Sequence, residues 1–197
     1  MPRAGLTRER VVDEGEKMAD ELGLGQVTLA ALALRLGVRQ PSLYKHIDGM
    51  AGLQRGLAVR AKTELAEVLS RAAVGRSRGD AVVSIAGAYR RWALAHPGRY
   101  VAAQRAPVSG DVDDEVAGAA AVQVVADVMA GFELHHDDAI DAIRALRAAL
   151  HGFVTLETGG AFGLPADVDR SFHRLVAGLV TALSAWTAAA ERVVGLG

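Results

Sequence analysis

The chain contains no cysteine and only five prolines among its 197 residues. The absence of cysteine excludes disulfide bonds and thiolate metal sites. No apolar run reaches the roughly 18 residues that a membrane-spanning helix needs, and no apolar signal segment follows Met1, so we expect neither a membrane protein nor a secreted one. The bias toward Ala, Leu, Val, Arg and Glu, without a run of alternating strand character, predicts an all-α fold of about nine helices.

Neither sign of charge is in large excess, and the net charge of −1 by itself argues against a nucleic-acid-binding protein. The charge is unevenly distributed along the chain, however. Residues 1–62 hold 10 Lys and Arg against 7 Asp and Glu, whereas residues 63–197 hold 12 against 16. A mildly basic N-terminal segment on an acidic body is compatible with a small DNA-binding head.

The most informative segment runs from Thr28 to Ile47 and predicts two short helices joined by a tight turn. Thr28 is a suitable N-cap for the first helix, and Gly37 is suited to end it. Pro41 fits the first turn of the second helix, where its missing N–H group is not needed. Apolar residues recur at helical spacing in the first helix, at Leu29, Leu32, Ala33 and Leu36. This pattern predicts a helix-turn-helix motif, whose second helix enters the major groove of DNA.

The residue types around the start of the second helix suit DNA readout. Gln40 can bond adenine and Arg39 can bond guanine, while Pro41 offers an apolar surface to a thymine methyl group. A further set is better placed to contact phosphates, which fix the register on DNA without reading sequence. These are Thr28, Ser42, Tyr44, Lys45 and His46. Two alternatives stay open: Arg39 as a solvated turn residue, and Tyr44 as a half-buried core residue.

The segment from Leu36 to His46 reads Leu-Gly-Val-Arg-Gln-Pro-Ser-Leu-Tyr-Lys-His and precedes a long predicted helix. It resembles the DNA-binding domain of TetR-family transcriptional regulators, and the resemblance covers residues 7–62. The segment 150–157, Leu-His-Gly-Phe-Val-Thr-Leu-Glu, is similar to the His-Gly signature of one subgroup of C-terminal domains in that family. The resemblance implies a ligand-responsive regulator, most often a repressor, that binds a near-palindromic operator as a homodimer.

Two departures from the family pattern concern the grip on DNA. Ala30 and Ala31 stand where basic side chains sometimes add contacts, and Gly49 and Met50 stand where a lysine commonly holds a phosphate. We therefore expect DNA affinity to fall less steeply with salt than it does for a more basic relative, because the slope follows the number of phosphates neutralised.

We predict a DNA-binding domain over residues 1–62, whose long fourth helix continues to about residue 73. A ligand-binding and dimerisation domain is predicted over residues 81–197. The resemblance implies that the last two helices, expected over 138–158 and 167–194, pair across a dimer axis into a four-helix bundle. The residues expected at this dimer interface are Ala149, Gly152, Phe153, Phe172, Leu175, Leu179, Leu183 and Trp186.

Large apolar residues of the body are interrupted by polar ones, as in ligand pockets, which are mostly apolar with a few placed polar groups. The predicted pocket residues are Tyr89, Trp92, His96, Tyr100, Gln104, Gln123, Met129, Arg147, His151 and Thr155. For each of these, an ordinary place in the core is the competing interpretation.

Other functions have weaker support. A metal-dependent hydrolase would rest on the segment 135–138, His-His-Asp-Asp, but adjacent residues on one loop cannot all turn to one ion. No Gly-x-Ser-x-Gly elbow supports a nucleophilic triad. A helical protein-interaction module without DNA binding is the remaining alternative. We expect no enzyme activity, no cofactor and no metal, and a bacterial cytoplasmic, nucleoid-associated protein whose partners are double-stranded DNA, a second copy and a small-molecule effector.

Overall fold

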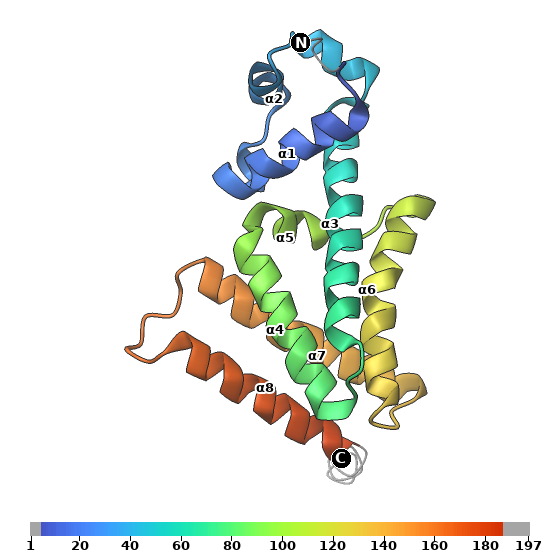
Figure 1. The fold of residues 1–197 in the computed structure, drawn as a ribbon, viewed down its shortest axis with the longest axis vertical. Coiled ribbons are helices and arrows are strands. Elements are labelled where there is room, and N and C mark those ends of the chain that lie inside the picture. The colour runs from blue at the N-terminus through green and yellow to red at the C-terminus, as the bar shows by residue number, and fades with distance from the viewer. Residues whose placement is uncertain (1–4, 187–197) are drawn as a thin grey trace, which may run out of the picture. The chain divides into compact units, whose positions relative to one another are not determined.

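The structure is a computed structural model that describes residues 5–186. Within those residues it has eight α-helices, two short 3-10 helices and no strand, which confirms the all-α prediction (Figure 1). None of the described helices combines the length and apolar character that a bilayer crossing requires. The helices form two compact units: the described part of Met1–Leu65 with Ala95–Gly118, and Ala66–Leu94 with the described part of Ala119–Gly197.

The first unit holds the predicted helix-turn-helix. Its elements are α1 (Arg8–Leu22), η1 (Leu24–Gln26), α2 (Leu29–Leu36), η2 (Gln40–Lys45), the first part of α3 (Gly49–Ala73), α5 (Pro97–Ala103) and the start of α6 (Val112–Ala130). The α1 helix begins where the hydroxyl of Thr7 accepts a hydrogen bond from the Arg10 N–H group. It packs against α3 where Gly15 faces Leu53 and Leu57 (Figure 1).

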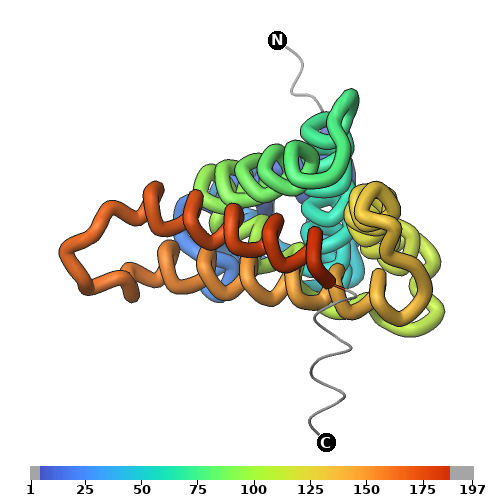
Figure 2. Tube along the Cα trace, turned by 90° about the horizontal axis from the view of Figure 1, so that it is seen from below, coloured from blue at the N-terminus to red at the C-terminus, as the bar shows by residue number. Residues whose placement is uncertain are grey.

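The second unit contains α4 (Arg78–Ala95) up to residue 94, the later parts of α3 and α6, and the two last described helices, α7 (His136–Thr158) and α8 (Val168–Ser184). Figure 2 shows α7 and α8 side by side and joined by a loop. The Asp167 carboxylate caps α8 by accepting a hydrogen bond from the Arg170 N–H group. The apolar residues that recur along α3 at every fourth position are all buried: Leu53, Leu57, Ala61, Leu65 and Leu69.

The second helix of the predicted motif differs from expectation, because η2 is a 3-10 helix rather than an α-helix. The N–H group of Ser42 bonds the Arg39 carbonyl, and that of His46 bonds the Leu43 carbonyl, three residues back in each case. A six-residue segment offers few i to i−4 pairs, so the tighter turn still satisfies its backbone groups. The side chains of this segment nevertheless project from one short helical turn, as the prediction requires.

Several predicted boundaries were wrong by a few residues. The helix expected over 138–158 begins earlier, at His136: its N-cap is His135, and Asp137 and Asp138 both lie in the first turn, where negative charge favours the helix dipole. The helix α4 ends at Ala95, just before Pro97, and Pro97 opens α5 in the position where proline is tolerated. The predicted end of the last helix near residue 194 lies outside the described residues.

Candidate nucleic-acid interface

The helix-turn-helix part of the first unit, made of α1, α2, η2 and the first part of α3 and called the head below, has a compact apolar core. Met18 of α1, Leu32 of α2, Leu43 of η2 and Leu53 of α3 are each almost completely buried. Four elements therefore each contribute a buried apolar side chain, and neither α2 nor η2 could bury its apolar side alone. This packing fixes the angle at which η2 leaves the turn.

The turn between α2 and η2 has the geometry that the sequence predicts. The Thr28 hydroxyl accepts a hydrogen bond of 3.2 Å from the Ala31 N–H group and so caps α2. Gly37 adopts φ 68°, a left-handed conformation that costs glycine little. The Val38 N–H group then bonds back to the Ala33 carbonyl at 3.0 Å, which closes the helix end. The turn is thus set by local hydrogen bonds as well as by the core.

The predicted base-reading residues lie at the exposed start of η2. Arg39, Gln40 and Pro41 are all exposed, with Arg39 as the N-cap residue in an extended conformation. Of the predicted phosphate-contact residues, Thr28, Tyr44 and Lys45 are exposed and Ser42 and His46 are half-buried. Tyr44, at 55% exposure, is not the half-core residue of the alternative interpretation. The apolar residues of this segment, Leu43 and Ile47, point into the core. One side of η2 therefore packs and the other presents hydrogen-bonding groups.

A hollow of about 270 Å³ lies beside the end of η2. Its lining residues are Arg8, Tyr44, Lys45, His46, Ile47, Asp48, Gly52 and Arg55. The structure thus brings three predicted phosphate-contact residues, Tyr44, Lys45 and His46, together in one concave surface. Two basic residues outside the predicted contact set also line it, Arg8 from α1 and Arg55 from α3. Their sequence distance from the motif gave no signal, since only the packing of α1 and α3 brings them here.

Ion pairs tie the head together around α1. The Arg35 guanidinium bonds Glu14 at 2.7 Å and Glu21 at 2.6 Å. These contacts lower the pKa of the exposed Glu21 carboxyl through its hydrogen bond to Arg35. Glu16 differs, because burial raises the pKa of its carboxyl although Arg60 lies 3.0 Å away. The helices α1 and α2 are therefore joined by ion pairs as well as by apolar contact.

A second set of ion pairs holds the segment that leads into α6. Arg55 bonds both carboxylate oxygens of Asp111 at 2.5 Å and one oxygen of Asp113 at 2.8 Å. The hydrogen bond from Arg55 lowers the pKa of the Asp111 carboxyl below its usual range. Asp114, three residues after Asp111, forms a buried pair with Lys62 of α3 at 2.5 Å.

Comparison with known proteins shows the family to which the chain belongs. The chain is 39% identical to the uncharacterized HTH-type transcriptional regulator Rv0681 of Mycobacterium tuberculosis over 175 residues, which are 88% of this chain and 79% of that protein. Residues 82–179 match the family model of the tetracyclin repressor-like C-terminal domain. The chain belongs to the TetR family of transcriptional regulators.

Two further proteins are similar to this TetR-family regulator, one in sequence and one in fold. It is 35% identical to the uncharacterized HTH-type transcriptional regulator YobS of Bacillus subtilis, over 86% of this chain and 88% of that protein. Its fold is similar to the TetR family protein ActR of Streptomyces coelicolor, solved in complex with (S)-DNPA, with a TM-score of 0.67 at 20% identity over 92% of this chain and 98% of that one. The protein is thus a regulator and not an enzyme, as expected from the sequence.

The predicted pocket residues of this TetR-family regulator fall in both units. His96, Tyr100 and Gln104 belong to the first unit, and the other seven belong to the second. In the second unit Tyr89, Trp92 and Met129 are buried, His151 is half-buried, and Gln123, Arg147 and Thr155 are exposed. Their role in ligand binding stays a prediction. A separate hollow of about 240 Å³, lined by Phe162, Leu164 and neighbouring residues, lies in the loop between α7 and α8.

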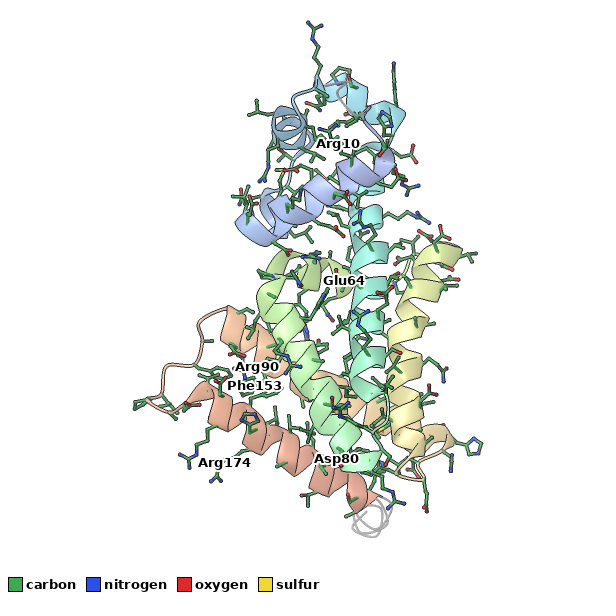
Figure 3. The ribbon with its side chains drawn as sticks, viewed as in Figure 1. Arg10, Glu64, Asp80, Arg90, Phe153 and Arg174 are labelled. Atoms are coloured by element: carbon green, nitrogen blue, oxygen red, sulfur yellow. The ribbon has the colours of Figure 1, made fainter. Side chains whose placement is uncertain are left out.

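A polar cluster of the second unit surrounds Arg90 of α4. Its guanidinium bonds Glu157 of α7 at 2.5 Å and Asp169 of α8 at 2.6 Å. It also stands over the ring of Phe153 and over that of Phe172, at 5.8 and 4.8 Å from the two centroids (Figure 3). The side chain of Arg90 is only 12% exposed. One half-buried cation therefore joins α4, α7 and α8.

The residues predicted for the dimer interface differ in burial within the single chain. Phe172 and Leu183 are buried in the second unit itself. The remaining six are half-buried: Ala149, Gly152, Phe153, Leu175, Leu179 and Trp186. No group of three or more His, Cys, Asp or Glu side chains that could hold a metal ion is found in residues 5–186.

Proposed function

We propose that this TetR-type regulator is a repressor that binds a near-palindromic operator as a homodimer and leaves it when a small-molecule effector binds. The observation that carries the proposal is the exposed start of η2. Arg39, Gln40 and Pro41 project from a turn that the Thr28 cap and Gly37 hold in place. Exposed donors and acceptors on a rigid support are what base readout in the major groove requires.

Phosphate contacts would come from the residues that flank this readout group. Tyr44, Lys45 and His46 line one hollow, and Thr28 and Ser42 stand at the starts of α2 and η2. Contacts of this kind set the register and supply the salt-dependent part of the affinity. Such binding would act at the nucleoid, in the bacterial cytoplasm.

Dimerisation would use α7 and α8, whose exposed sides carry small residues. On α7 these are Ala148 and, half-buried, Gly152; on α8 they are Ala177, Gly178 and Ala182. A Cβ atom added at Gly152 or at Gly178 would meet nothing within 4 Å in the single chain. Small residues let a second pair of helices approach closely, and an isologous dimer would present two heads to two half-sites.

The effector would bind within residues 81–197, in the tetracyclin repressor-like C-terminal domain. The similar fold of ActR holds (S)-DNPA, which supports a ligand-binding role for this region. The effector would favour a head spacing unlike the roughly 34–36 Å between successive major grooves. Release then requires only that it binds the two states with different affinity.

Selection of binding sites from random duplex DNA, followed by sequencing, tests the proposal. We expect an enriched inverted repeat whose half-site spacing gives the geometry of the dimer. A selection at low salt that enriches nothing would contradict the repressor for the effector-free protein and favour the protein-interaction module.

A substitution then tests whether the turn reads sequence. We expect Gln40→Ala to weaken binding to the selected site by about 1–3 kcal/mol and to relax specificity at one base pair. Gln26→Ala is the matched control, since Gln26 is an exposed glutamine of the same unit in η1. Equal effects of both substitutions would argue against η2 as the reading element.

A further inference from the structure

The hollow beside η2 is rich in basic side chains. Arg8, Lys45 and Arg55 line it together with His46, and Asp48 is its one acidic lining residue. These residues come from α1, from the end of η2 and from α3. A concave surface with three cations and the hydroxyl of Tyr44 is suited to a phosphate group, which takes charge-assisted hydrogen bonds from arginine and lysine.

The three cations are not equally available. Within residues 5–186, neither Arg8 nor Lys45 forms an ion pair, whereas Arg55 bonds Asp111 through Nε and Nη2 and bonds Asp113 through Nη2. The Arg55 side chain is 33% exposed and the Asp111 side chain is 13% exposed. Two carboxylates more than cancel the charge of one guanidinium, so Arg55 as seen here adds no net attraction for an anion.

We propose that Arg8 and Arg55 belong to the surface that holds a phosphate of the operator backbone, and that the Asp111 and Asp113 carboxylates restrain Arg55 by competing for its guanidinium. This inference rests on the DNA binding proposed above. It assigns DNA-contact roles to two residues outside the helix-turn-helix segment. It also supplies cationic groups at a surface where the start of α3 offers only Gly49 and Met50.

The acidic pair can be neutralised with little change of shape. Asp111 also accepts a hydrogen bond from the Asp114 N–H group at 3.3 Å, near the start of α6. Asparagine keeps an oxygen for that bond and is as good a capping residue as aspartate. Asp111→Asn with Asp113→Asn therefore removes the charge that holds Arg55 and preserves the local backbone geometry.

The experiment compares four proteins by their affinity for the selected duplex at several salt concentrations: wild type, Asp111→Asn/Asp113→Asn, Arg55→Gln, and the triple variant. We expect the asparagine pair to bind more tightly and its log–log salt slope to steepen by about 0.9, the value for one more phosphate neutralised. Its advantage over wild type then grows about 3.5-fold when salt is diluted fourfold, from about 200 to about 50 mM. In the triple variant the gain disappears, because Arg55 is absent.

A matched pair controls for the general change of charge. Glu14→Gln with Glu21→Gln removes two carboxylates from Arg35, an arginine of the same unit with 32% exposure that does not line the hollow. We expect a smaller gain and no steeper slope. An equal gain in this control, a gain that persists without Arg55, or weaker binding by the asparagine pair would each overturn the proposal. Thermal unfolding of every variant verifies that the fold is retained.

Substitution of Arg8 provides an independent test of the same surface. Arg8→Gln should lower the salt slope by about 0.9 whether or not the aspartates are present. An unchanged slope would remove Arg8 from the site. If wild type itself binds no duplex at low salt, the proposed DNA binding fails and this inference falls with it. If wild type binds but the four proteins show no coupling between Arg55 and the aspartates, only this inference fails.

Discussion

The buried pair of Lys62 on α3 and Asp114 on α6 offers a sharp test of how the first unit is held together. The two side chains are 6% and 5% exposed, and their charged atoms lie 2.5 Å apart. Lys62→Met replaces the lysine with an apolar side chain of similar length. The substitution leaves a carboxylate buried without its partner, which is the costly way to break such a pair.

The expected cost follows from the surroundings of Asp114. Removing one member of a buried ion pair costs about 3–5 kcal/mol. Asp114 lies in the first turn of α6, where the helix dipole returns roughly 1 kcal/mol to a carboxylate. We therefore expect Lys62→Met to lower the free energy of unfolding by about 2–4 kcal/mol. At about 2–4 °C per kcal/mol for a chain of this size, Tm falls by about 4–16 °C.

Denaturant unfolding of three variants measures this value. Adding Asp114→Leu to Lys62→Met removes both charges, so the double variant should return to within about 1 kcal/mol of wild type. Asp114→Leu alone should be destabilising, since it strands the lysine. The reasoning is refuted if the double variant is as unstable as the worse single variant, because shape and not unpaired charge would then account for the loss.

Two further predictions concern α1. Gly98→Ala should lower the free energy of unfolding by several kcal/mol in thermal unfolding, because the added Cβ would stand 2.0 Å from the Ala19 carbonyl oxygen. The control Gly118→Ala, whose added Cβ has its nearest atom at 3.7 Å, should be neutral or gain up to about 1 kcal/mol. Equal effects of the two substitutions would contradict the close packing of α5 on α1. The raised pKa of the Glu16 carboxyl means that its contribution to stability is present below its unfolded value near pH 4.5 and is lost as the pH rises through the folded value. Glu16→Gln should therefore gain stability relative to wild type as the pH rises above about 4.5, and a pH-independent difference in denaturant unfolding would contradict this.

Much of the DNA-binding head was predictable because its signals are local. The Thr28 cap, the left-handed Gly37 and the start of η2 at Gln40 each depend on residues within four positions in the chain. The buried residues of α3 from Leu53 to Leu69 likewise recur at helical spacing, which is a local property of the sequence. The start of α7 was misplaced because aspartate is favoured both at the cap and in the first turn, so the residue types could not separate the two positions.

The sequence by itself determined the helical class, the turn between α2 and η2, and the exposure of Arg39 and Gln40, since helix formation, capping and a short turn are decided within a few residues. Only the tertiary structure decided which distant charges meet. Arg55 pairs with Asp111, which lies 56 positions away in the chain, and Lys62 pairs with Asp114, which lies 52 positions away. No spacing rule predicts such partners. Packing of one helix on another selects them, because ion pairs form between whichever charged side chains the buried apolar faces bring together.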